Sequence, residues 1–147
     1  MSDLASLDAT DQAALVRSGE VTPAELVQAA VDRAEQVNGK LNAIIHPRYQ
    51  EAVAEAGGDL PDRPFTAVPF VLKDLHGTAA GQPLHAGTRF LKEAGYVADT
   101  DSELTVRFRD AGLVVIGRTN TPELGLVTTT EPEAYGAAHN PSDLDRS

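Results

Sequence analysis

The chain of 147 residues contains neither cysteine nor tryptophan, and aromatic residues make up only 5% of it. Without cysteine, it can form neither a disulfide nor a thiolate metal site. No apolar run approaches the roughly 20 residues that an α-helix needs to cross a bilayer. The first residues, Met1-Ser2-Asp3-Leu4, lack the basic stretch and the apolar block of a signal peptide. These absences predict a soluble, cytoplasmic protein.

Positive charge is also scarce, since 12 basic residues face 22 acidic ones and the formal net charge is −10. A protein that binds nucleic acid needs a basic face to meet the phosphates. An anionic membrane surface would repel the chain for the same reason. We therefore expect no nucleic-acid or membrane partner, and we interpret the acidity as favouring solubility rather than a cationic partner.

Motifs that hold metals or cofactors are missing as well. No two of the four histidines have the spacing of three or four that places metal ligands on one helical face, so structural or surface roles are expected for all of them. They are His46, His76, His85 and His139. The glycines after Leu72 fit neither a dinucleotide-binding loop nor a Walker loop. Glu131 and Glu133 lie among prolines and are expected to be solvated. The sequence predicts no metal and no cofactor.

Two helices are predicted at the start of the chain. Thr10-Asp11-Gln12 can cap a short helix that Ser18-Gly19 ends. Thr22-Pro23-Ala24-Glu25 is a capping box with proline at the first helical position. Apolar residues at helical spacing follow it, and Asn38-Gly39 is predicted to close this second helix. Residues 1–40 are therefore expected to form a helical entry segment.

Helices and strands alternate in residues 41–147, which are predicted to form the first part of an α/β core. Strands are expected at 41–46, 68–72 and 113–117, and helices at 48–56, 88–94 and 101–111. In the last helix, Leu104, Phe108 and Ala111 are expected to share one apolar face. A helix, then Gly112, then an apolar strand is the half-turn of an α/β layered fold.

Lys73 directly follows the apolar strand predicted at 68–72. Partial burial at a strand end disfavours the charged form of a lysine and would let it act as a base. The alternative from residue chemistry alone is an ordinary lysine that pairs with Asp74 or with solvent. One lysine does not decide between these interpretations.

Several motifs occur in an order that resembles the amidase-signature family. Residues 68–74, Val-Pro-Phe-Val-Leu-Lys-Asp, resemble its "G-x-P-x-x-x-K-D" strand, and Gly81 with Ala86-Gly87-Thr88 resembles its glycine-rich turn. Residues 99–106 look like its next helix start. Residues 111–123, Ala-Gly-Leu-Val-Val-Ile-Gly-Arg-Thr-Asn-Thr-Pro-Glu, closely resemble "A-G-A-v-i-x-G-K-T-N-x-x-E". Tyr135-Gly136 and Asn140-Pro141 match "f-G-x-x-x-N-P". The resemblance runs from Thr22 to Ser147.

The resemblance implies an amidase with an α/β fold, in which helices cover a mixed β-sheet. In that family a Ser–cis-Ser–Lys triad hydrolyses carboxamides, and Lys73 matches its lysine. The two serines belong to a Gly-Gly-Ser-Ser-Gly-Gly signature and the residues after it, which in the family follow the position of Ser147. Ser142 and Ser147 do not match either serine. The chain is therefore expected to be the N-terminal part of an amidase domain, incomplete and inactive by itself.

The resemblance also points to a substrate-binding loop. Gly125, Leu126, Thr128 and Thr129 are expected to border the acyl pocket, with simple packing of the loop as the alternative. Asn120 is expected to be structural and to tie the strand end to the loop that follows it. Tyr135 replaces the usual phenylalanine, and Ala67 replaces a usual glycine.

Two alternatives to a free-standing amidase stay open. One is a truncated, non-catalytic fragment. The other is the A-type subunit of a glutamine-dependent tRNA amidotransferase, which usually reads "M-D-E-F-A-M-G" where this chain has residues 121–126, Thr-Pro-Glu-Leu-Gly-Leu. This difference favours a general amidase. For such an enzyme the resemblance implies a small-molecule amide substrate and no cofactor, and a homodimer is the expected state of the full-length enzyme.

Overall fold

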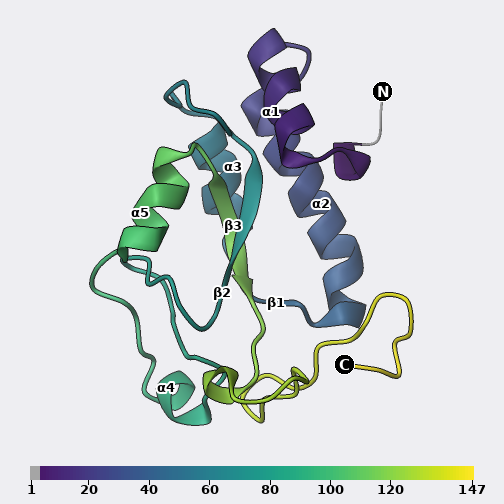
Figure 1. The fold of residues 1–147 in the computed structure, drawn as a ribbon, viewed down its shortest axis with the longest axis vertical. Coiled ribbons are helices and arrows are strands. Elements are labelled where there is room, and N and C mark those ends of the chain that lie inside the picture. Colours follow the sequence, from purple (N-terminus) through teal and green to yellow (C-terminus); the bar gives the residue numbers. More distant parts are fainter. Residues whose placement is uncertain (1–3) are drawn as a thin grey trace. The chain divides into compact units, whose positions relative to one another are not determined.

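The computed structural model describes residues 4–147 and has a mixed α/β fold (Figure 1). Its helices are α1 (Ala9–Ser18), α2 (Pro23–Leu41), α3 (Tyr49–Ala56), α4 (Arg89–Glu93) and α5 (Glu103–Asp110), with short 3-10 turns at Leu4–Ser6 and Glu123–Gly125. Its strands are β1 (Ile44–Pro47), β2 (Pro69–Lys73) and β3 (Val114–Thr119). None of the helices in residues 4–147 is long and apolar enough to cross a membrane. The expectation drawn from Met1-Ser2-Asp3 lies outside the described residues.

The three strands form one sheet in the order β1-β3-β2. β1 runs antiparallel to β3, with a register irregularity between Ile44 and His46. β2 runs in the same direction as β3, since the Val114 N–H donates to the Val68 carbonyl near the start of both strands and the Asp74 N–H donates to the Thr119 carbonyl at their end. The predicted mixed α/β sheet is confirmed.

The chain divides into two compact units. The first contains residues 4–36 with Arg48–Val71 and Arg107–Ile116, and the second contains Val37–Pro47, Leu72–Val106 and Gly117–Ser147. Valines, alanines and an isoleucine from α2, α3 and β3 form the hydrophobic core of the first unit. They are Val27, Val31, Ala52, Ala56, Val114 and Ile116. Lys73 and the predicted substrate loop both belong to the second unit.

The capping box predicted at the start of α2 is confirmed. The Thr22 N–H donates to Glu25 Oε2 at 2.8 Å, and the Glu25 N–H donates back to Thr22 Oγ1 at 3.2 Å. These bonds satisfy two N–H groups that the first turn of the helix leaves without partners. The Thr22 hydroxyl, which donates to Glu25 Oε2 at 2.7 Å, and the Thr22 N–H together hold the pKa of the Glu25 carboxyl below its usual value.

Replacing Thr22 by alanine is therefore expected to lower the free energy of unfolding by about 1 kcal/mol. Urea denaturation of the variant measures this loss. Thr10→Ala is the matched control, because it makes the same change at an exposed position within the first turn of α1. Equal effects of the two substitutions would show that the cap contributes nothing.

The prediction that Asn38-Gly39 closes α2 is wrong, because the helix continues to Leu41. Asn38 stays helical, and its side-chain oxygen accepts the N–H groups of Ala43 and Ile44 at 2.9 and 2.7 Å. The residue that ends the helix is Asn42, whose φ of 47° is left-handed. Asparagine tolerates this conformation at a helix C-terminus almost as glycine does. Strand β1 consequently begins at Ile44, later than predicted.

Two smaller corrections concern α1 and α5. The N-cap of α1 is Asp8, whose carboxylate accepts the N–H groups of Thr10 and Asp11, so the predicted cap lies two residues too late.

In α5 the fully buried side chain is Thr105, whereas Leu104, which was expected on the apolar face, is 47% exposed. The Thr105 hydroxyl reaches Ser102 Oγ at 3.1 Å, which lets a polar residue occupy the buried face.

Candidate active site

Lys73 is the last residue of β2. Leu72 and Asp74 on either side of it are buried, whereas Lys73 itself is exposed. Successive side chains of a strand point to opposite faces, so Lys73 projects from the face opposite to its two neighbours. The expectation that this side chain is drawn into low dielectric does not hold for residues 4–147. The suggested pairing with Asp74 is also absent from the described ion pairs.

Asp74 is fully buried and anchors the loop that follows β2. Its Oδ1 accepts the N–H of His85 at 2.9 Å, and its Oδ2 accepts the N–H of Gly87 at 3.3 Å. Its own N–H donates to the carbonyl of Thr119 on β3 at 3.0 Å. Asp74 therefore joins the end of β2 both to the neighbouring strand and to the glycine-rich loop.

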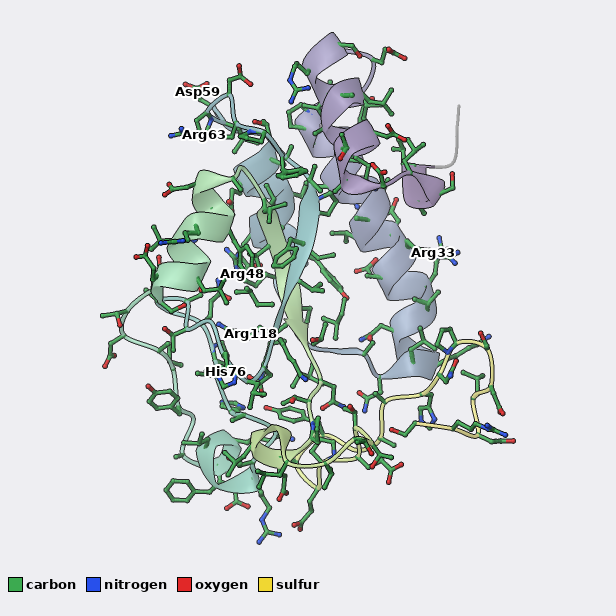
Figure 2. The ribbon with its side chains drawn as sticks, viewed as in Figure 1. Arg33, Arg48, Asp59, Arg63, His76 and Arg118 are labelled. Atoms are coloured by element: carbon green, nitrogen blue, oxygen red, sulfur yellow. The ribbon has the colours of Figure 1, made fainter. Side chains whose placement is uncertain are left out.

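Arg118, on β3, is 1% exposed and is the largest fully buried side chain among the described residues. Its Nη1 donates to the carbonyl of Lys73 at 3.2 Å, and its Nη2 donates to the carbonyl of Gly77 at 2.8 Å. Figure 2 labels Arg118 and His76, which precedes Gly77 in the loop after β2. Burial lowers the pKa of the Arg118 guanidinium, and the Asp74 carboxylate opposes this shift. The guanidinium thus spans the turn between Lys73 and Gly77.

A cluster of two histidines and a tyrosine lies beside Asp74. The Tyr135 hydroxyl hydrogen-bonds to His85 Nδ1 and, at 3.2 Å, to His46 Nε2. His46 Nε2 is also 3.9 Å from Asp74 Oδ1, and the Lys92 ammonium lies 4.3 Å from the centre of the Tyr135 ring. Burial, with a smaller effect of Asp74, raises the pKa of Tyr135 to about 12. The hydroxyl is therefore neutral near pH 7 and can connect the two imidazoles.

Sequence spacing gives no signal for this cluster. His46 comes from β1, His85 from the loop after β2, and Tyr135 from the C-terminal segment. Both histidines are held by hydrogen bonds to Tyr135, and their structural role stays a prediction. The sequence analysis did not predict that His46 and His85 both contact Tyr135, because this contact depends on the pairing of β1 with β3.

The stability of the chain is expected to fall as the pH drops from about 7 to about 5 because of His46. Burial lowers the pKa of His46, and His85, Arg118 and Lys92 act in the same direction while Asp74 opposes them. The unfolded state therefore binds more protons than the folded state below the ordinary histidine pKa of about 6.5, so the free energy of unfolding rises with pH in this range.

Urea denaturation at several pH values checks this expectation. His46→Gln should flatten the dependence, whereas His76→Gln, which changes an exposed histidine, should leave it unchanged. The same slope in both variants and in the unmodified protein would contradict the assignment to His46.

Two of the four predicted substrate-binding residues line a pocket in the second unit. Leu126 and Thr129 border a cavity of about 330 Å³, together with prolines, a valine and two glutamates. These are Pro122, Pro132, Val127, Glu123 and Glu131. Gly125 and Thr128 do not line it. Gly125 instead packs against the loop after β2, since a Cβ at this position would lie 2.7 Å from Leu75 Cδ2. The loop thus lies directly beside the residues that follow Lys73.

Asn120 fixes the start of this loop. Its Nδ2 donates to the carbonyl of Gly136 at 3.0 Å, and its Oδ1 accepts the Thr121 N–H at 2.9 Å. Asn42 adds bonds from its Nδ2 to the carbonyls of Tyr135 and Ala137. Asn120 thus ties the end of β3 to Thr121 and Gly136 in the segment that follows, while its role toward residues 125–129 stays a prediction.

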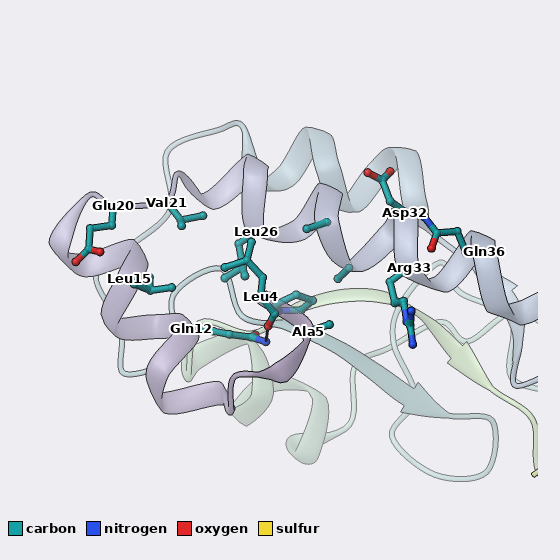
Figure 3. Close-up of a pocket in the computed structure, with 13 residues that line it drawn as sticks. Leu4, Ala5, Gln12, Leu15, Glu20, Val21, Leu26, Asp32, Arg33 and Gln36 are labelled. Atoms are coloured by element: carbon teal, nitrogen blue, oxygen red, sulfur yellow. Dashed lines mark hydrogen bonds between the residues drawn. The ribbon is translucent and has the colours of Figure 1, made fainter. Parts of the chain in front are cut away.

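A larger pocket of about 700 Å³ lies in the first unit, between the N-terminal turn, α1 and α2 (Figure 3). Leucines, alanines and a few polar side chains line it, among them Gln12, Arg33 and Gln36. None of the candidate residues borders it, so the candidate chemistry is confined to the second unit. Residues 4–147 also contain no group of three or more histidines or carboxylates that could hold a metal ion.

Comparison with known proteins gives one consistent result. A family model described as Amidase matches residues 25–147. The chain is 46% identical over 140 residues to a 6-aminohexanoate-cyclic-dimer hydrolase of Paenarthrobacter ureafaciens, covering 95% of this chain and 28% of that protein. It is 38% identical over 153 residues to the A-type subunit of the glutamyl-tRNA(Gln) amidotransferase of Salinispora arenicola, covering 99% of this chain and 30% of that protein.

Solved structures agree with these matches. A 6-aminohexanoate cyclic dimer hydrolase in complex with substrate superimposes with a TM-score of 0.90 at 43% identity, covering 98% of this chain and 29% of that one. A bacterial aryl acylamidase of the amidase signature family gives a TM-score of 0.85 at 30% identity, with 95% and 30% covered. The chain thus spans less than a third of the length of these relatives.

Proposed function

Because this chain belongs to the amidase family, we propose that the full-length protein hydrolyses carboxamide C–N bonds and that Lys73 is the general base of this reaction. The single observation that supports this most is the family match over residues 25–147, which includes β2 with Lys73 at its end. Residues 1–147 form the first part of one amidase domain in this proposal.

The proposed mechanism follows from the chemistry of serine nucleophiles. A serine hydroxyl attacks a carbonyl poorly until a neighbouring base accepts its proton. Neutral Lys73 takes a proton from a bridging serine, which takes one from the nucleophilic serine; both serines lie outside the 147 residues. The lysine replaces the histidine of the better-known triad. Backbone N–H groups stabilise the tetrahedral oxyanion, the amine leaves, and water hydrolyses the acyl-enzyme.

The substrate that we propose is a small amide with an aliphatic or aryl acyl group. Similarity to enzymes named for a cyclic dimer of 6-aminohexanoate and for aryl amides supports this class. The pocket beside the substrate loop offers Leu126 and Val127 as apolar lining for such a group. We also propose a cytoplasmic location, a homodimer and no cofactor for the full-length protein.

The second candidate is an amidotransferase component, because several relatives of 33–38% identity carry that name. The free-standing amidase is favoured by the higher identity of 46% to a hydrolase and by Thr121-Pro122 following Asn120. The 147-residue chain by itself is proposed to be inactive, since Lys73 is its only member of the triad.

The test is a comparison of amide substrates with the purified full-length protein. We expect hydrolysis of the cyclic 6-aminohexanoate dimer or of a simple anilide without any added partner protein. Turnover of glutamine alone, appearing only with partner proteins and acylated tRNA, would favour the amidotransferase. Absence of turnover with all of these substrates would exclude both.

A further inference from the structure

We infer that Arg118 and Asp74 are positioning residues for Lys73, which together fix the peptide groups on its C-terminal side so that its side chain leaves β2 in one direction. The inference rests on the proposed function of Lys73. In the proposed mechanism, Arg118 and Asp74 neither contact the substrate nor belong to the catalytic triad.

The first support is the geometry around the Lys73 carbonyl. That oxygen accepts a hydrogen bond from Arg118 Nη1 at 3.2 Å, and the next N–H in the chain, that of Asp74, donates to Thr119 O at 3.0 Å. Both partners come from β3. The peptide bond between Lys73 and Asp74 is therefore held at its oxygen and at its nitrogen by one strand. A strand end would otherwise be free to twist, since no further sheet bond follows it.

The second support is the way the loop after Lys73 is closed. Arg118 Nη2 holds the Gly77 carbonyl at 2.8 Å, while the Asp74 carboxylate holds the N–H groups of His85 and Gly87. Gly77 and Gly87 both have positive φ values, 73° and 68°. Because glycine can adopt many other φ values, the loop keeps this conformation only where other contacts hold it. The Arg118 guanidinium and the Asp74 carboxylate hold the loop that follows Lys73 at Gly77, His85 and Gly87.

The burial of Arg118 and Asp74 is not what stabilisation of the fold alone would favour. Arg118 Nε is buried without a hydrogen-bond partner, and both charged side chains are almost completely excluded from solvent, at 1% and 0% exposure. Buried charged side chains often contribute less to stability than apolar residues of the same size would. What the guanidinium does offer is a rigid planar fork that reaches two carbonyls at once.

The experiment compares Arg118→Met, Arg118→Lys and Asp74→Asn in the full-length protein, using amide hydrolysis and thermal unfolding as readouts. Methionine fills a similar space without a donor, whereas lysine restores a cation that can donate to the carbonyls. We expect kcat to fall about 10²-fold in Arg118→Met with little change in KM, because a small displacement of a catalytic group has this effect. Arg118→Lys should recover only part of kcat, because an ammonium can donate to a carbonyl but lacks the fork that reaches both. Asp74→Asn should lower kcat as Arg118→Met does.

The matched control is Arg48→Met. Arg48, also labelled in Figure 2, donates its Nη1 to the Val115 carbonyl of the same strand at 2.9 Å, but it belongs to the first unit. We expect it to lose thermal stability while keeping kcat. If kcat follows stability equally in Arg118→Met and Arg48→Met, or if Arg118→Lys is no more active than Arg118→Met, the positioning role is overturned.

Two further outcomes are informative. If Arg118→Met does not fold, Asp74→Asn carries the test, and wild-type kcat in that variant overturns the inference; failure of both to fold shows a structural role and overturns it too. Lys73→Ala separates this inference from the proposed function. Full activity of Lys73→Ala overturns the proposed function, whereas an inactive Lys73→Ala with a fully active Arg118→Met overturns only the positioning role.

Discussion

Replacing Lys73 by alanine in the full-length protein is expected to lower kcat for amide hydrolysis about 10³-fold or more. The reason is that the proposed nucleophilic serine keeps its proton when no base is present to accept it. Lys73→Arg should be as inactive as Lys73→Ala, since a guanidinium keeps the positive charge but cannot lose its proton near neutral pH. This pair separates a base from a cation that merely stabilises charge.

Steady-state kinetics on one amide substrate measures the effect, with Lys40→Ala as the control. Lys40 is an exposed lysine near the end of α2, and its removal should leave kcat unchanged. The Lys73 side chain is exposed in the described residues, so its substitution should change the free energy of unfolding by less than about 0.5 kcal/mol. Activity in Lys73→Arg would show that Lys73 does not act as a base.

Gly87→Ala is expected to destabilise the protein by about 3 kcal/mol, the largest effect on stability that we predict. Gly87 has a φ of 68°, and a Cβ there would lie 2.6 Å from the Thr121 carbonyl oxygen and 3.0 Å from backbone atoms of Pro122. Backbone atoms cannot turn aside as a flexible side chain can. The loop would have to move, and the N–H of Gly87 would lose its bond to Asp74.

Gly81→Ala provides the matched control for this prediction. Gly81 has a similar φ of 76°, but no atom lies within 4 Å of the position its Cβ would take. Gly81→Ala should therefore lower the free energy of unfolding by only about 1 kcal/mol, which is the cost of the left-handed conformation for alanine. Chemical denaturation of both variants measures the difference. Similar losses in the two would mean that the close approach of Thr121 to Gly87 has no energetic consequence.

The elements of this fold could be predicted where the signal is local. The apolar runs that became β2 and β3 and the capping box at Thr22 depend only on neighbouring residues, and each was found close to its observed position. The end of α2 could not be predicted from Gly39. A glycine can remain helical when the following residues hold the helix, and here the Asn38 side chain and the left-handed Asn42 do so.

The surroundings of Lys73 were less accessible to sequence reasoning. Arg118 follows an apolar strand and would ordinarily be expected at the surface, yet it is 1% exposed and donates to the carbonyls of Lys73 and Gly77. Its contacts with Lys73 and Gly77 join residues more than 40 positions apart. The same is true of Tyr135 with His46, which are separated by 89 positions. Such contacts exist only once the sheet has formed.

Mapping the site of covalent labelling tests the central claim most directly. The full-length protein would be treated with a fluorophosphonate, which reacts with an activated serine nucleophile, and the labelled peptide would be identified by mass spectrometry. We predict a label on a serine that follows residue 147, and its loss in Lys73→Ala. A label on Ser142 or Ser147, or labelling that is unchanged in Lys73→Ala, would contradict the proposal that Lys73 serves a nucleophile outside these 147 residues.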